Sequence, residues 1–142
     1  MSPEKVLLDN GDQHGSIWLG PDGTASWFVL DLQQPYIVTS FHVKNTLNAQ
    51  HGDRWTTDFK VSLSQDKQSW QEASSGTLEK HLDLQVLSSS VTSPMRYVKF
   101  EMLGYGTSGG GLGFFQVMGT RPGSGEQLFS HHALVSSLGE NH

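Results

Sequence analysis

The chain has 142 residues, a formal net charge of −5 at pH 7 and no cysteine, and 35% of its residues are hydrophobic. This length suits one domain with its own core, and the missing cysteines exclude disulfides and thiolate metal sites. The acidic balance, without any basic run, argues against nucleic-acid binding and against docking on an anionic membrane by charge.

Neither a membrane-spanning helix nor a signal peptide is expected. No apolar run approaches the roughly 20 residues that a membrane helix needs. The apolar run near the N-terminus, residues 6–8, is too short for a signal peptide. The chain is therefore expected to be cytosolic as written, or a mature piece of a secreted protein.

The segment after residues 6–8 is acidic and contains Asp9, Asn10, Gly11 and Asp12. Aspartate side chains are hard oxygen ligands and a glycine lets the chain wrap an ion, so a structural calcium ion near Asp9 and Asp12 is one interpretation. An ordinary turn rich in Asx residues and glycine is the other. The EF-hand spacing is absent, and the residues leave both interpretations open.

Residues 27–32 are apolar except for Asp31 and show no alternation, which predicts a central strand buried on both faces. A turn is predicted at residues 33–35 and a second strand over residues 36–43. Asp31 is expected to cap the neighbouring turn with its carboxylate. A catalytic role for Asp31 is the less favoured alternative, because no histidine is close to it in sequence.

Four later segments also have the pattern of strands, at residues 59–64, 82–86, 96–102 and 114–118. The first three alternate apolar and polar residues, which is typical of strands with one wet face. Leu82, Leu84 and Val86 are the apolar positions of the second. With about eight strands at short intervals and no convincing helix, the sequence predicts an all-β domain, a sandwich or jelly roll.

The domain is expected to end near residue 122. Residues 123–125, Gly-Ser-Gly, have the composition of a flexible linker. Leu128, Val135 and Leu138 follow at roughly helical spacing. Residues 123–142 are therefore predicted to be a linker and tail, whether a short helix, a disordered segment or a cloning remnant.

The long polar segment of residues 45–55 carries the strongest functional signal. Planar amides and arginine hydrogen-bond pairs of sugar hydroxyls, and an aromatic face covers the apolar side of a pyranose. Because loops on a rigid sandwich commonly carry binding, we predict ligand contacts from Asn45, Asn48, His51, Arg54 and Trp55. The alternative is that these polar groups tie the loop to itself and that Trp55 belongs to the core.

Signatures of catalysis are missing from the sequence. No Gly-x-Ser-x-Gly elbow occurs, and the glycine-rich run at residues 106–113 lacks the Gly-Lys-Ser/Thr ending of a phosphate loop. No histidine pair has convincing zinc spacing. The sequence therefore predicts a non-enzymatic protein without a cofactor.

Five pieces of the sequence, in order, resemble the discoidin domain, also called the coagulation factor V/VIII type C domain. They are Leu8-Asp9 with Ser16-Ile17-Trp18, residues 27–32, residues 64–70, Arg96-Tyr97-Val98, and residues 112–119. The resemblance runs from about residue 7 to residue 119. It implies an eight-stranded antiparallel jelly-roll β-sandwich of the galactose-binding-like fold, here over residues 1–122.

Members of this family bind ligands with loops at one end of the sandwich, so the resemblance implies a lectin-like module outside the cell or on its surface. Their ligands include galactose- or fucose-type sugars, anionic lipids, collagen and other proteins. We expect glycans or glycoproteins as partners, without membrane insertion, and add Tyr105 from an adjacent loop to the contact residues. A protein–protein interaction or cell-adhesion module without sugar binding is the alternative. Calcium-holding members use a closing glutamate where this chain has Phe114, so the resemblance disfavours the calcium interpretation.

Overall fold

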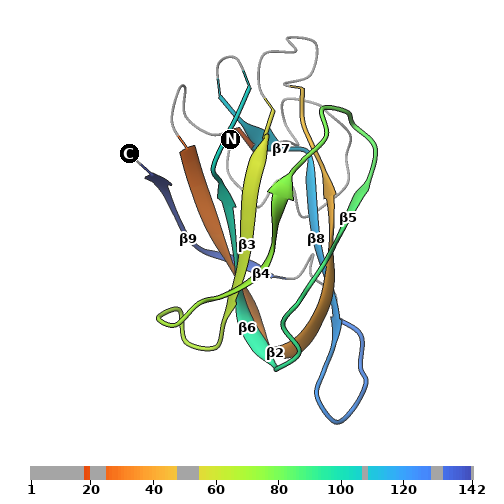
Figure 1. The fold of residues 1–142 in the computed structure, drawn as a ribbon. Coiled ribbons are helices and arrows are strands. Elements are labelled where there is room, and N and C mark those ends of the chain that lie inside the picture. The colour runs from red at the N-terminus through yellow and green to blue at the C-terminus, as the bar shows by residue number, and fades with distance from the viewer. Residues whose placement is uncertain (1–17, 20–24, 48–54, 107–108, 129–132, 142) are drawn as a thin grey trace.

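A computed structural model describes residues 18–19, 25–47, 55–106, 109–128 and 133–141 (Figure 1). Within these residues the regular elements are all β-strands, which confirms the all-β prediction. The described residues contain no helix long and apolar enough to cross a membrane. The strands are β1 (Trp18–Leu19), β2 (Ala25–Lys44), β3 (Asp58–Ser64), β4 (Gln71–Thr77), β5 (Gln85–Ser88), β6 (Met95–Met102), β7 (Gly111–Leu112), β8 (Phe114–Thr120) and β9 (Leu134–Asn141).

The strand β2 belongs to both layers of an antiparallel sandwich. Its first half, up to Asp31, lies between β6 and β9, and its second half, from Ile37, lies between β5 and β8. β3 and β4 extend the first layer beyond β6, and β1 pairs with β7. Figure 1 shows β2 curving from one layer into the other at the lower end of the view. The predicted antiparallel sandwich is confirmed.

The change of layer occurs at a bend in β2, where the sequence predicts a turn at residues 33–35. Gln33 has a positive φ of 73°, and the pairing register shifts between Asp31 and Tyr36. The Gln33 amide donates a hydrogen bond of 2.7 Å to Asp31 Oδ1, so the capping role expected of Asp31 is confirmed. The Asp31 carboxylate accepts the Gln33 amide in place of a backbone carbonyl on a neighbouring strand. The predicted turn is therefore a bend within one continuous strand.

Phenylalanine rings from both layers form the centre of the core. Phe28 and Phe100 come from the first layer, Phe41 and Phe115 from the second, and all four are fully buried. The ring centroids of Phe100 and Phe115 are 5.6 Å apart, and those of Phe28 and Phe115 are 5.7 Å apart. Such aromatic pairs contribute about 0.5–1.5 kcal/mol beyond the burial of their area. These ring contacts join the two layers at the centre of the sandwich, below the loops at the ends of the strands.

The strand predicted over residues 82–86 is shorter and shifted, because β5 covers only Gln85–Ser88. Leu82, Leu84 and Val86, expected on the inner face, are 42%, 45% and 60% exposed. Leu87 instead packs against the core, opposite the second half of β2. The predicted facing of this segment is wrong because Leu87 breaks the alternation and takes the inward position.

The segment after β8 returns to the sandwich as a strand. Gly123 and Gly125 have positive φ values of 83° and 71°, in a tight connection closed by the bridge between Thr120 and Gln127. The chain then continues into β9, which pairs with the first half of β2. The flexible linker and the short helix predicted for residues 123–142 are wrong for the described part of this segment. Its glycines serve a turn that needs left-handed residues.

Candidate functional site

Several described segments meet at the end of the sandwich opposite the bend of β2, near β7 in Figure 1, and we call them the loop end. They are residues 45–47, 55–58, 78–81, 103–106 and 109–111. Thr56 forms a β-bridge with Tyr105. The Thr57 amide donates to the Gly104 carbonyl at 3.0 Å, and the Leu78 amide donates to the Thr57 carbonyl at 2.9 Å. The described parts of the polar loop and of the glycine-rich loop therefore lie side by side, as the resemblance implies.

Asn45 holds three of these segments together and is only 1% exposed. Its Oδ1 accepts hydrogen bonds from the Thr46 and Thr56 amides at 2.9 and 3.0 Å, and its Nδ2 donates to the Thr56 and Glu79 carbonyls at 2.9 and 3.0 Å. Thr56 Oγ1 in turn donates to the Gly111 carbonyl at 2.6 Å. The predicted ligand contact by Asn45 does not fit, because its side chain is buried and its hydrogen-bonding groups are used by the backbone.

Trp55 lies half-buried at the surface of the loop end. Lys80 Nζ stands 3.8 Å from the centroid of its ring. The backbone of Gly106 also lies against this ring, and a Cβ there would come within 2.2 Å of a ring carbon. The Gly106 amide donates to the Trp55 carbonyl at 2.9 Å. Only glycine fits at position 106 without moving the ring, so the indole is held in one orientation.

Tyr105 is the second aromatic residue of the loop end. It is half-buried and its ring packs against the edge of the core. The bridge to Thr56 places Tyr105 on the segment next to Trp55. The structure thus brings together two of the residues predicted from the sequence to contact ligand.

The other predicted ligands and contacts cannot be placed at the loop end, because they lie outside the described residues. For the polar loop these are Asn48, His51 and Arg54, and for the calcium interpretation Asp9 and Asp12. Among the residues that the structure does describe, no group of three or more His, Asp or Glu side chains is arranged to hold a metal ion.

The segment after β4 contributes to the loop end in a way that the sequence-based predictions missed. His81 Nε2 lies 2.6 Å from Glu79 Oε2, and the Asp83 amide donates to His81 Nδ1 at 3.2 Å. These hydrogen bonds fold the segment on itself, and Lys80 within it lies over the indole ring of Trp55. The charged run that precedes the alternating residues was the available signal, since it favours a loop over a strand.

Asp31, the alternative catalytic candidate, is engaged in an ion pair. Arg96 Nε and Nη2 donate to its two carboxylate oxygens at 2.8 and 3.0 Å. These hydrogen bonds from Arg96 hold the pKa of Asp31 below its ordinary value. A carboxylate with a lowered pKa is a weaker base, so the geometry favours the structural role of Asp31.

Comparison with protein families gives one finding that covers most of the chain. The family model described as the F5/8 type C domain matches residues 2–114. A comparison with curated proteins gives no match.

Solved structures with a similar fold include carbohydrate-binding modules. Chitosan-binding module 1 from a chitosanase/glucanase of Paenibacillus sp. IK-5 has a TM-score of 0.64 at 16% identity, over 82% of this chain and 84% of that one. The module CBM32-5 from Clostridium perfringens, in complex with GalNAc-β-1,3-galactose, has a TM-score of 0.53 at 21% identity, over 63% and 62%. An F5/8 type C domain from Bacteroides fragilis has a TM-score of 0.61 at 14% identity, over 80% and 78%. At these identities the likeness shows the fold.

Proposed function

Because the chain belongs to the F5/8 type C domain family, we propose that it is a non-enzymatic carbohydrate-binding module. Its ligands in this proposal are galactose- or fucose-type glycans, free or carried by glycoproteins, and the loop end binds them. The proposed place of action is outside the cell or at its surface, where such glycans are displayed.

The half-buried ring of Trp55, at the surface of the loop end, is the observation that carries this proposal. An indole face covers the C–H side of a pyranose. Since the backbone of Gly106 already holds the ring in place, little side-chain ordering is needed when a sugar binds. The polar groups proposed to fix the sugar hydroxyls belong to Asn48, His51, Arg54 and Tyr105.

The names of two similar structures support the class of ligand. One is a module named for chitosan, and the other was solved with GalNAc-β-1,3-galactose. The second contains a galactose-type sugar, which is the class proposed here. A shallow site among loops offers few buried contacts, so we expect weak binding, in the micromolar to millimolar range.

A glycan array, run with calcium and again with a chelator, tests the proposal. We expect selective binding to galactose- or fucose-terminated glycans. Arg54→Ala is expected to abolish it, and Trp55→Ala to weaken it about tenfold through the loss of stacking. Loss of binding in the chelator would support a calcium site near Asp9 and Asp12.

The matched control is Trp70→Ala, which removes another half-buried tryptophan. The Trp70 ring centroid lies 5.7 Å from the Nζ of Lys99, which projects from the outer face of β6, away from the loop end. This variant is expected to bind glycans like the wild type. A blank array from a folded sample would overturn the proposal, as would equal losses in Trp55→Ala and Trp70→Ala.

A protein-interaction module is the second candidate, because the described surface carries several exposed apolar side chains. They are Leu82, Leu84, Val86, Leu103, Leu134 and Leu138. Leu84→Asp and Val86→Asp would weaken capture of a protein partner in a pull-down experiment, whereas glycan binding through the loop end would not respond to them.

A further inference from the structure

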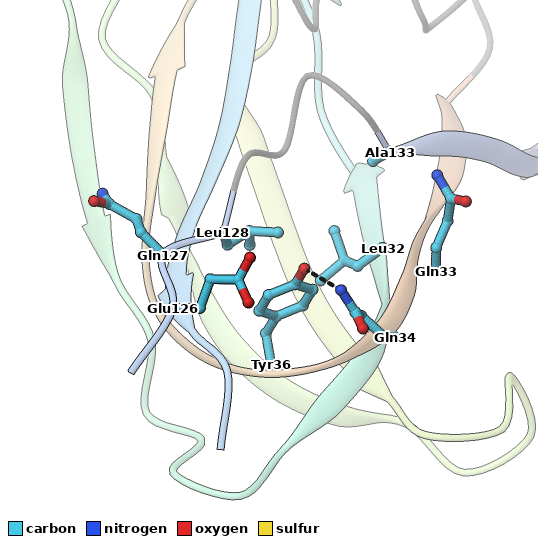
Figure 2. Close-up of a pocket in the computed structure, with 8 residues that line it drawn as sticks. All are labelled: Leu32, Gln33, Gln34, Tyr36, Glu126, Gln127, Leu128 and Ala133. Atoms are coloured by element: carbon cyan, nitrogen blue, oxygen red, sulfur yellow. Dashed lines mark hydrogen bonds between the residues drawn. The ribbon is translucent and has the colours of Figure 1, made fainter. Parts of the chain in front are cut away.

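A cavity of about 280 Å³ lies in the bend of β2, at the end of the sandwich opposite the loop end (Figure 2). One wall is the bend itself, and the other is the segment between β8 and β9, through residues 126–128 and Ala133. The volume is near the lower limit of about 300 Å³ for small-molecule sites. The cavity therefore suits a ligand of one ring rather than an extended chain.

The floor of the cavity is apolar and aromatic. It consists of Tyr36, Leu32, Leu128 and Ala133, all of which are buried, and Figure 2 shows the Tyr36 ring between the two walls. The Leu128 amide donates to the Gly119 carbonyl at 2.9 Å, which ties the second wall to β8. A floor of this kind complements the C–H groups of a pyranose.

The rim of the cavity is polar. Gln34 Nε2 donates to Tyr36 Oη at 2.8 Å, and the Glu126 carboxylate lies 3.6 Å from the Arg121 guanidinium. Within the described part of the chain, the Tyr36 hydroxyl hydrogen, Gln34 Oε1 and the Gln127 side-chain amide have no partner. Amides and hydroxyls are the groups that pair with sugar hydroxyls, and no cation is among the described residues that line the cavity.

The backbone at the rim is fixed in an unusual conformation. Gln33 has a φ of 73°, in a region that residues other than glycine rarely adopt. The Asp31 carboxylate accepts the Gln33 amide, and Arg96 holds the carboxylate in turn. A glycine would meet the bend at lower cost, whereas glutamine adds a side-chain amide beside the cavity. Backbone strain of this kind collects at ligand sites.

From these observations we propose that the cavity is a second glycan subsite, which takes one neutral pyranose ring. The Tyr36 floor supports the C–H face of the ring, and Gln34 and Gln127 hydrogen-bond its hydroxyls. An anionic sugar is disfavoured, because Glu126 lies at the rim and Arg121 is already paired with it. The subsite lies at the opposite end from Trp55 and binds independently of the loop end.

Nuclear magnetic resonance titration of the ¹⁵N-labelled full chain tests this subsite. The probes are the neutral methyl glycosides of galactose, fucose, glucose and N-acetylglucosamine, added into the tens of millimolar. For at least one probe we expect saturable shifts of the Gln33, Gln34 and Gln127 amides. The affinity at these amides should fall about tenfold in Gln34→Ala and in Gln127→Ala, and remain unchanged in Trp55→Ala.

Gln71→Ala is the matched control, because Gln71 is exposed and lies on β4, at the far edge of the first layer. It should leave the shifts at the bend of β2 unchanged. If no probe shifts the cavity amides, or if Trp55→Ala abolishes those shifts, the second subsite is refuted. Probe binding at Trp55 alone would refute the subsite and leave the proposed function of the loop end standing. Since Gln127 is exposed, Gln127→Ala decides the test should Gln34→Ala fail to fold.

Discussion

Replacing Asn45 by alanine separates a structural role from a ligand contact. The substitution removes four hydrogen bonds to backbone groups, two accepted by Oδ1 and two donated by Nδ2. The net contribution of such a bond is about 1 kcal/mol, and a buried backbone group left without a partner costs about 1–3 kcal/mol. Because Asn45 is 1% exposed, little water reaches the orphaned groups in the native state. We therefore expect the free energy of unfolding to fall by about 3–4 kcal/mol.

This loss is measurable by urea unfolding followed by tryptophan fluorescence, with the midpoint and slope compared with the wild type. Domains of this size are stable by about 5–15 kcal/mol, so Asn45→Ala should still fold at low temperature. Gln71→Ala, an exposed amide on β4, is the matched control and should change the stability by less than about 0.5 kcal/mol. A loss below about 1 kcal/mol together with abolished glycan binding would refute the structural role and return Asn45 to the contact residues.

Three further predictions follow from described contacts. Arg96→Met should lower the melting temperature near neutral pH and lose its effect in acid, because Arg96 lowers the folded pKa of Asp31. The ion pair thus stabilises the folded state at pH values above the ordinary aspartate pKa of about 3.9, and this stabilisation is lost as the pH falls through the folded pKa of Asp31. A difference in melting temperature between Arg96→Met and the wild type that stays constant from pH 7 to pH 2 contradicts this. Deleting residues 123–142 should lower the free energy of unfolding, measured in urea, by more than about 2 kcal/mol, because it uncovers the edge of β2 that pairs with β9 and removes the buried Leu128. An unchanged urea midpoint refutes the placement of β9. Lys80→Ala should raise the affinity for neutral sugars about twofold to fivefold in a calorimetric titration, since a cation–π contact of about 0.5–1 kcal/mol no longer competes for the Trp55 ring. A lower affinity would mean that Lys80 itself contacts the sugar.

The strands at the centre of the fold were predictable because their side chains alternate without competition. In β3, Phe59, Val61 and Leu63 all belong to the core cluster, and the residues between them, Lys60 and Ser62, do not. The period of two therefore identifies the set that faces the core. It does not predict that Ser62, on the opposite face, is also buried, with 4% of its surface exposed. The capping role of Asp31 was also predictable, since a short carboxylate before a bend has one near partner, the amide two residues on.

Strands at the edges of the layers were harder to predict. At β5, Leu87 interrupts the alternation set by Leu82, Leu84 and Val86, and periodicity alone cannot decide which set faces the core. In the C-terminal segment, Leu128, Val135 and Leu138 fit a helical spacing, but Val135 pairs with Leu30 in a ladder that the local sequence does not contain. In both cases the deciding contacts come from β2, far away in the chain.

The loop end shows the same limit for function. A polar loop that binds a ligand and one that binds itself have the same composition, because both need amides, carboxylates and arginine. Asn45 belongs to a loop that binds itself, because its side chain hydrogen-bonds the backbone of Thr56 and Glu79. Neither partner can be read from the composition of the loop. The sequence could identify the loop and its aromatic residue, Trp55, but not divide its polar groups between framework and ligand.

The length of β2 decides how the two proposed sites could act together. The second half of β2 runs from the bend at Tyr36 to Asn45 just beyond its end, a span of at most about 30 Å for a strand. A short oligosaccharide cannot reach around the sandwich from one end to the other. Two occupied sites would therefore hold two separate glycan chains, and the gain would be cross-linking of a polymer or cell-surface layer rather than tighter binding to one small sugar. If the cavity is refuted as a subsite, only the loop end remains, and tight attachment would require several copies of the domain.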